Sequence, residues 1–260
     1  MHRILFLLML PAAVPAQPTL DGESARIFRF AHAESPQQRM DITNAIRSVA
    51  ELQRAVVDSQ PAALVVRGTP EQLDLAAWIF GELDRGSGAP AATVMESYKV
   101  PGDYAPQVRA FLLAHGGTPQ TMQEIVNTVR TVADVQRVMS YEANAALVLR
   151  GNSDQVDLAG WIIRNLDKPT GVQSEAKPLE ATYNDSSSRP ATAVRMYRLT
   201  HNTSPQALQE LVNAVRSVAD VQRVIVDNAI ATVTLRGTPV QAAMATWLIQ
   251  ELERGPAKEK

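Results

Sequence analysis

The sequence has 260 residues, of which 45% are apolar and 20% are charged, and its formal net charge is −2. This composition is typical of a globular protein. The slight acidic balance argues against a protein that coats nucleic acid, because such proteins carry a marked basic excess. The absence of cysteine excludes disulfides and cysteine-ligated zinc, so the fold must be stabilised by packing.

Residues 1–16 are predicted to be a secretory signal peptide. His2 and Arg3 form a short basic segment, residues 4–10 are an apolar run, and residues 14–16 offer a small-residue cleavage site. The apolar run is too short to cross a membrane, which takes about 20 residues. We therefore expect an exported protein without a transmembrane span in its mature form, and the bacterial periplasm is the compartment that suits it best.

Three segments of the chain are copies of one another. Residues 26–84, 109–167 and 195–253 align without a gap, at constant offsets of 83 and 86 residues, and are called units one, two and three below. Shared identities include Arg26/Arg109/Arg195, His32/His115/His201, Pro36/Pro119/Pro205, Asn44/Asn127/Asn213, Gln53/Gln136/Gln222, Gly68/Gly151/Gly237, Gln72/Gln155/Gln241 and Trp78/Trp161/Trp247. Residues 85–108 and 168–194 are predicted to be linkers, and residues 254–260 a tail.

The first half of each unit predicts a strand followed by a helix. An apolar run with one aromatic residue, Phe28, Phe111 or Tyr197, opens the unit. Ser35-Pro36 and its equivalents then place a capping hydroxyl before a proline suited to the first helical position. In unit three the apolar stripe expected to face the sheet is Leu208, Leu211, Val212, Val215 and Val218.

The second half of each unit predicts a hairpin and a second helix. In unit three, residues 224–226 and 232–235 read as strands on either side of a turn at Asp227-Asn228. The second helix begins after Thr69, Asn152 or Thr238. Its inward side in unit one is expected to be Leu73, Ala76, Ala77, Phe80 and Leu83. The order β-α-β-β-α predicts an α+β fold with a three-stranded sheet and two helices on one face of it.

These features resemble a known family. The capped first helix, hairpins ending in LVVRGTPEQ or VTLRGTPVQ, and a second helix closing on a Leu-Asp or Leu-Glu pair are similar to the periplasmic N-domains of bacterial secretins, the channels of type II and type III secretion and type IV pili. The resemblance implies rings of side-by-side domains that contact inner-membrane partners. Only residues 254–260 follow unit three, so we expect no pore-forming domain here.

Nine arginines at three repeated positions are the candidate interface residues. The first set, on the first helix, is Arg47, Arg130 and Arg216; the second set, Arg54, Arg137 and Arg223, and the third set, Arg67, Arg150 and Arg236, flank the hairpin strands. Their guanidinium groups can bind carboxylates in a bidentate manner. They are interpreted either as a surface that pairs with acidic groups of a neighbouring unit or as salt bridges within each unit.

The remaining repeated residues favour structural roles. One histidine per unit, with no cysteine, supplies too few ligands for a metal site unless subunits meet, so His32, His115 and His201 are interpreted as loop residues, with an interface or pH-sensitive role as the alternative. The tryptophans are expected to pack over a seam between helix and sheet. Gly68 and its equivalents are expected to need positive φ or a close backbone approach.

No catalytic signature is present: the sequence contains neither HExxH nor GxSxG, and no phosphate-binding glycine loop. We therefore expect a non-enzymatic structural or interaction protein, without metal or cofactor, that docks onto a secretion or pilus machine or forms its own oligomer. The alternative is an envelope protein that binds phospholipid or peptidoglycan, similar to the small BON-type domains. RNA binding of the KH type is disfavoured, because no unit has a GxxG loop in the required place.

Overall fold

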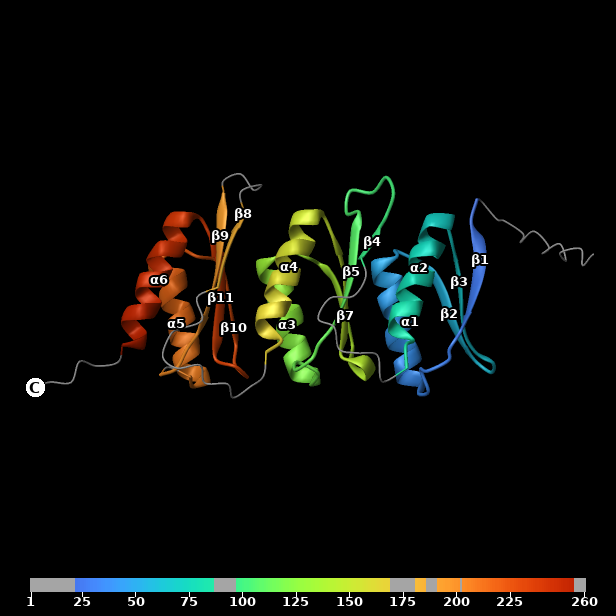
Figure 1. The fold of residues 1–260 in the computed structure, drawn as a ribbon, viewed down its shortest axis with the longest axis horizontal. Helices are drawn as coiled ribbons and strands as arrows, with labels where there is room; N and C mark the ends of the chain where they lie inside the picture. The colour runs from blue at the N-terminus through green and yellow to red at the C-terminus, as the bar shows by residue number, and fades with distance from the viewer. Residues whose placement is uncertain (1–21, 87–96, 169–180, 186–190, 202, 255–260) are drawn as a thin grey trace, which may run out of the picture.

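The computed structural model describes residues 22–86, 97–168, 181–185, 191–201 and 203–254. The predicted signal peptide and most of the predicted tail lie outside the described residues. The described residues form three α+β units that lie in a row, each with a sheet and a layer of two helices (Figure 1). This confirms the predicted fold class and the β-α-β-β-α order.

Unit one shows the common plan. Its elements are β1 (Ser24–Arg29), α1 (Pro36–Val49), β2 (Arg54–Ser59), β3 (Ala62–Gly68) and α2 (Pro70–Leu83). The sheet has the order β1-β3-β2, and both strand pairs are antiparallel. The third strand is therefore central, and the predicted hairpin is β2-β3.

Units two and three repeat this plan. Unit two contains β5 (Gln107–Leu112), α3 (Pro119–Val132), β6 (Arg137–Tyr141), β7 (Ala146–Gly151) and α4 (Ser153–Leu166), with a short 3-10 turn, η1 (Glu142–Asn144), inside the hairpin. Unit three contains β9 (Thr192–Arg198), α5 (Pro205–Val218), β10 (Arg223–Asp227), β11 (Thr232–Gly237) and α6 (Pro239–Glu253).

The sheets of units two and three have a fourth strand that the sequence did not predict. Strands β4 (Ser97–Lys99) and β8 (Ala181–Asp185) pair antiparallel with β5 and β9 and complete the orders β4-β5-β7-β6 and β8-β9-β11-β10. Both strands lie in segments predicted to be linkers. An edge strand is paired on one side only, so it needs little apolar patterning of its own, and its sequence signal is weak.

The helices begin where the capping residues predict. Ser35 and Thr69 each accept a hydrogen bond from the backbone amide of the third helical residue, and the Gln38 and Gln72 side chains bond back to the cap. Asn152 replaces the hydroxyl residue in unit two and caps α4 in the same manner. Each such cap stabilises a helix by about 1 kcal/mol.

The repeated glutamine of the second helix ties the two helices of a unit together. In unit one its Nε2 donates to the backbone oxygen of Glu51 at 3.0 Å, just past the end of α1, and the bond recurs from Gln155 to Asp134 and from Gln241 to Asp220 at 2.7 Å. Gly68 lies beside this contact: a Cβ there would come within 2.4 Å of Leu52 and 2.8 Å of Gln72. Close approach, and not positive φ, is thus the reason for this glycine.

A carboxylate at the end of the second helix holds the loop after the first strand. Asp84 accepts from the backbone amides of Ala31, His32 and Ala33 at 2.7, 3.1 and 2.8 Å. Asp167 makes the same three bonds in unit two, to Ala114, His115 and Gly116 at 2.7, 2.7 and 2.8 Å. Glu253 accepts from Thr200 and His201 in unit three. This contact gives the terminal Leu-Asp or Leu-Glu pair a physical role.

We predict that Asp167→Ala lowers the free energy of unfolding by about 2–3 kcal/mol, because it removes a charged acceptor from three backbone amides. Asp157→Ala is the matched control, since Asp157 is exposed and pairs only at the surface with Arg109, a contact worth about 0–1 kcal/mol. Urea denaturation followed by circular dichroism measures both changes. Equal effects of the two substitutions would contradict the role given to Asp167.

Candidate interaction site at the joints between units

The helices of one unit pack on the open sheet face of the next. Helix α1 of unit one contacts β6 of unit two, and α3 of unit two contacts β10 of unit three, so helical and sheet layers alternate along the row (Figure 1). Val108, Ala110 and Val148 on the outer face of the second sheet belong to the same apolar cluster as the helices of unit one. Likewise Val194 and Met196 join the cluster of unit two. We call these contacts the first and second joint.

Arg150, from the third arginine set, is the central polar residue of the first joint. Its side chain is only 3% exposed. It donates to the backbone oxygen of Val49, in the last turn of α1, at 2.6 Å. It also donates to the Asp103 carboxylate and to the backbone oxygen of Ala105, both of which precede β5. A cation at the C-terminus of a helix also interacts favourably with the helix dipole.

Arg137, from the second arginine set, makes an ion pair across the first joint. It contacts the carboxylate of Glu51, the residue that follows α1 and adopts a left-handed conformation with φ 57°. Ending a helix in this conformation turns the chain and places the Glu51 side chain toward the next unit. Nη1 of Arg150 also lies 3.8 Å from the Glu51 carboxylate. Glu51 thus binds Gln72 through its backbone oxygen and Arg137 through its carboxylate.

The second joint repeats both contacts. Arg236 donates to the backbone oxygen of Val132 at 3.1 Å, as Arg150 does to Val49. Arg223 lies 3.3 Å from the carboxylate of Asp134, which has φ 60°. The same arginine positions therefore meet the same helix end at both joints.

The first arginine set has a different role. Arg47, Arg130 and Arg216 each donate to a backbone oxygen of the second strand of their own unit, Ala55, Val138 and Val224, at 2.5, 3.0 and 3.2 Å. These bonds fix the first helix over its own sheet. The structure thus divides the nine candidate arginines. The first set binds within its own unit, whereas the second and third sets, in units two and three, reach the preceding unit.

Unit one has no preceding unit among the described residues, and its two arginines of these sets bind within the unit. Arg54 and Arg67 lie 3.0 and 2.9 Å from the carboxylate of Glu23, which precedes β1. Asp103 occupies a comparable place before β5, where it binds Arg150.

A pair of carboxyl groups lies inside the second joint. Asp227, at the end of β10, is 2% exposed, and Oδ2 of Asp227 and Oε2 of Glu124 on α3 are both buried without a donor. Burial, together with the neighbouring Glu124, raises the pKa of Asp227 to about 7. A proton on the Asp227 carboxyl group, directed at Glu124, gives both oxygens a partner. At the first joint Tyr141 and Asp41 occupy the equivalent positions, and burial raises the pKa of Tyr141 to about 12.

The repeated histidines and tryptophans make contacts of their own. The histidines lie in the loops bound by the terminal carboxylates, with His115 Nδ1 4.0 Å from Asp167 and His201 Nδ1 3.7 Å from Glu253. Trp78 packs against Tyr98 of β4, with ring centroids 5.8 Å apart, and Trp161 is partly buried against the second cluster. Trp247, at the same position in unit three, is 55% exposed.

The residues that sequence reasoning missed are the acidic partners. Glu51, Asp134 and Asp220 occupy one aligned position, shortly after the repeated arginine of the first helix. Glutamate stands there in unit one and aspartate in units two and three, so the position is absent from the set of strict identities. Val218 was expected to face the sheet of its own unit, but it is 58% exposed; its equivalents Val49 and Val132 are buried because the next unit covers them.

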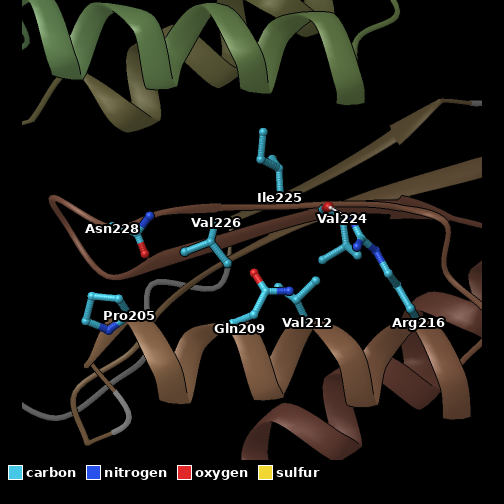
Figure 2. A pocket seen from close by; sticks show the side chains of 8 residues that line it. All are labelled: Pro205, Gln209, Val212, Arg216, Val224, Ile225, Val226 and Asn228. Carbon is cyan, nitrogen blue, oxygen red and sulfur yellow. Dashed lines mark hydrogen bonds between the residues drawn. The ribbon is translucent and has the colours of Figure 1, made fainter.

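A small cavity lies within unit three. It has a volume of about 210 Å³ and is lined by Pro205, Gln209, Val212, Arg216, Val224, Ile225, Val226 and Asn228. Figure 2 shows Val224 and Val226 directed toward α5, whereas Ile225 points away from it toward unit two. The volume is below the usual range of ligand pockets, about 300–1,000 Å³.

Among the described residues there is no group of three or more His, Asp or Glu arranged to hold a metal ion, and no helix long and apolar enough to cross a membrane.

We predict that Arg150→Met lowers the free energy of unfolding by about 2–3 kcal/mol, because the Val49 carbonyl and the Asp103 carboxylate lose their donor. Arg164→Met, on the exposed side of α4, is the control and is expected to change stability by less than about 0.5 kcal/mol. Hydrogen exchange adds a specific readout, since the loss of protection should concentrate in α1 and β6. Uniform loss across all three units would contradict a role at the joint.

The buried carboxyl pair predicts a pH dependence of stability. Because the pKa of Asp227 rises from 3.8 unfolded to about 7 folded, the native state binds more protons over this range, and this contribution to stability falls as pH rises from about 4 to about 7. The difference in unfolding free energy between wild type and Asp227→Asn should fall by about 2–4 kcal/mol between about pH 4 and about pH 7, and it should stay constant above that range. Urea titrations at a series of pH values measure it; a difference independent of pH would refute the protonation of Asp227 in the folded state.

No protein-family model and no curated protein matches the chain. Among solved structures, the chain is similar to the N-terminal domain of the secretin XcpQ from Pseudomonas aeruginosa, with 16% identity, coverage of 88% of this chain and 100% of that chain, and a TM-score of 0.28. It is also similar to ExeD from Aeromonas hydrophila, with 12% identity, 90% coverage of this chain, 41% of that chain and a TM-score of 0.21.

A third similar structure is an aspartate kinase from Synechocystis, with 12% identity, coverage of 90% of this chain and 42% of that chain, and a TM-score of 0.23. The chain thus spans less than half the length of ExeD and of the kinase. At this low degree of similarity the chain resembles both a secretin domain and an enzyme, so these comparisons assign it no function.

Proposed function

We propose that this protein is a non-enzymatic interaction protein of the bacterial periplasm, whose secretin N-domain-like units dock onto or assemble with a secretion or pilus machine. The observation that carries the proposal is the joint, which forms twice with the same helix end and the same two arginine positions. These units use their conspicuous charged residues to bind each other, and a domain built to stack on its own kind is suited to assembly.

The ends of the row support a docking role. The outer sheet face of unit one exposes Ile27 and Val56, at 62% and 66%, and the outer helical face of unit three exposes Met244 and Trp247, at 43% and 55%. Apolar side chains gathered on one face of a folded protein commonly mark an interaction surface. Both ends thus offer surfaces of the kind that the inner joints bury.

The test is crosslinking in cells that make the protein. A photoreactive phenylalanine analogue at Val56 or Met244 is expected to form adducts with an envelope protein of a secretion or pilus machine. The control is the same analogue at Tyr104, which is 92% exposed and lies away from both end faces; it should form no such adduct. Adducts with phospholipid or peptidoglycan alone would favour the ligand-binding alternative. Adducts with a second copy of the chain are compatible with docking only if an envelope protein is captured as well, and adducts with the chain alone would contradict docking to a machine.

A further inference from the structure

The described residues form two complete joints, and units three and one carry the two halves of a third. In both inner joints the end of the first helix of one unit meets the outer sheet face of the next. Unit three has such a helix end, and unit one has such a sheet face, with no described residue of another unit against either. We propose that a second copy of this chain completes the joint, with unit one of one copy stacked on unit three of another.

The exposed helical residues of unit three are those that the joints bury elsewhere. Val218, Met244 and Leu252 are 58%, 43% and 45% exposed. The equivalent residues of both preceding units are at most 2% exposed. They are Val49, Leu75 and Leu83 in unit one and Val132, Leu158 and Leu166 in unit two. The sequence thus keeps large apolar residues at positions where only a following unit would cover them.

The sheet face of unit one shows the converse pattern. Ile27 and Val65 are 62% and 37% exposed. Their equivalents Ala110 and Val148 in unit two, and Met196 and Thr234 in unit three, are all 1–2% exposed because the preceding helices cover them. Val56, 66% exposed, corresponds to Met139 and Ile225, which pack against the preceding units.

The polar parts of the joint are also present at both ends. Asp220 follows α5 with φ 53° and binds Gln241 through its backbone oxygen, so it has the conformation of Glu51 and Asp134. Arg54 and Arg67 stand where Arg137 and Arg150 stand in unit two. In the proposed joint, Arg54 pairs with Asp220 and Arg67 donates to the backbone oxygen of Val218. Arg67 can keep its contact with Glu23, since Arg150 binds Asp103 and Val49 at once.

One pair of like charges would meet in this joint. Asp58 and Glu210 are the equivalents of Asp227 and Glu124, whose carboxyl groups already face each other at the second joint. The inner joint accommodates this pair at the same position, so it does not exclude the third joint. Because the two faces in the proposed contact differ, the association is head to tail, and it either closes into a ring or extends as a filament.

This inference rests on the proposed role as an assembly protein, but it concerns the purified chain alone, so its test is separate from the crosslinking in cells. Sedimentation velocity of the mature chain, over about two orders of magnitude in concentration, is expected to show reversible association. Val56→Glu and Met244→Glu, at positions exposed in the monomer, should each weaken it at least tenfold and leave the circular dichroism unchanged. A chain that stays monomeric throughout would overturn the proposal.

Charge exchange identifies the surfaces. Arg54→Asp and Asp220→Arg should each weaken association, because each places like charges at the joint. An equimolar mixture of the two variants should associate again, since each contact in an alternating stack then joins opposite charges. Arg164→Asp, on an exposed helix face away from the ends, is the control and should change nothing. Association that is insensitive to Val56→Glu and not restored by mixing would show that the copies meet through another surface.

Discussion

The structure depends on the packing of a helical layer against the open sheet face of the next unit, fixed at its centre by an arginine on a helix end. A unit of this size buries only about 60% of the surface of its unfolded chain, and one face of its sheet has no cover within the unit. Arg150 explains why the layers meet in one arrangement: its guanidinium group is buried, so its bonds to Val49 and Asp103 tolerate little displacement. A buried charge that lost these partners would cost several kcal/mol.

The joint also explains features that look unrelated in a single unit. The left-handed residue after the first helix both accepts a hydrogen bond from the glutamine of the second helix and presents its carboxylate to the next unit. The glycine that ends the third strand leaves room for that glutamine. Folding of a unit and recognition of its neighbour therefore share residues, and neither can change without the other.

Much of the fold could be predicted from the sequence, because local chemistry specifies it. Serine, threonine or asparagine caps mark the start of every long helix among the described residues, and gapless repetition makes each copy evidence for the others. The edge strands β4 and β8 could not be predicted in the same way, since a short strand paired on one side leaves almost no pattern.

The candidate arginines were found by their identity across units. Their division into roles within and between units depends on which backbone oxygen each reaches, and that is a tertiary property. Val218 is a second example of a tertiary property. Its position on the apolar stripe predicts burial, but the sequence of the helix does not show whether a following unit covers it.

The central claim is that the three units form one stack held by two equivalent joints. Because the chain has no cysteine, spin labels can be attached through single introduced cysteines at Glu71 on α2 and Val240 on α6, both exposed, and the distance between them measured by pulsed electron resonance. A rigid stack predicts one narrow distance distribution that broadens when Arg150 is replaced by methionine. A broad distribution in the unaltered chain would mean that the units move independently on tethers, and would contradict the account.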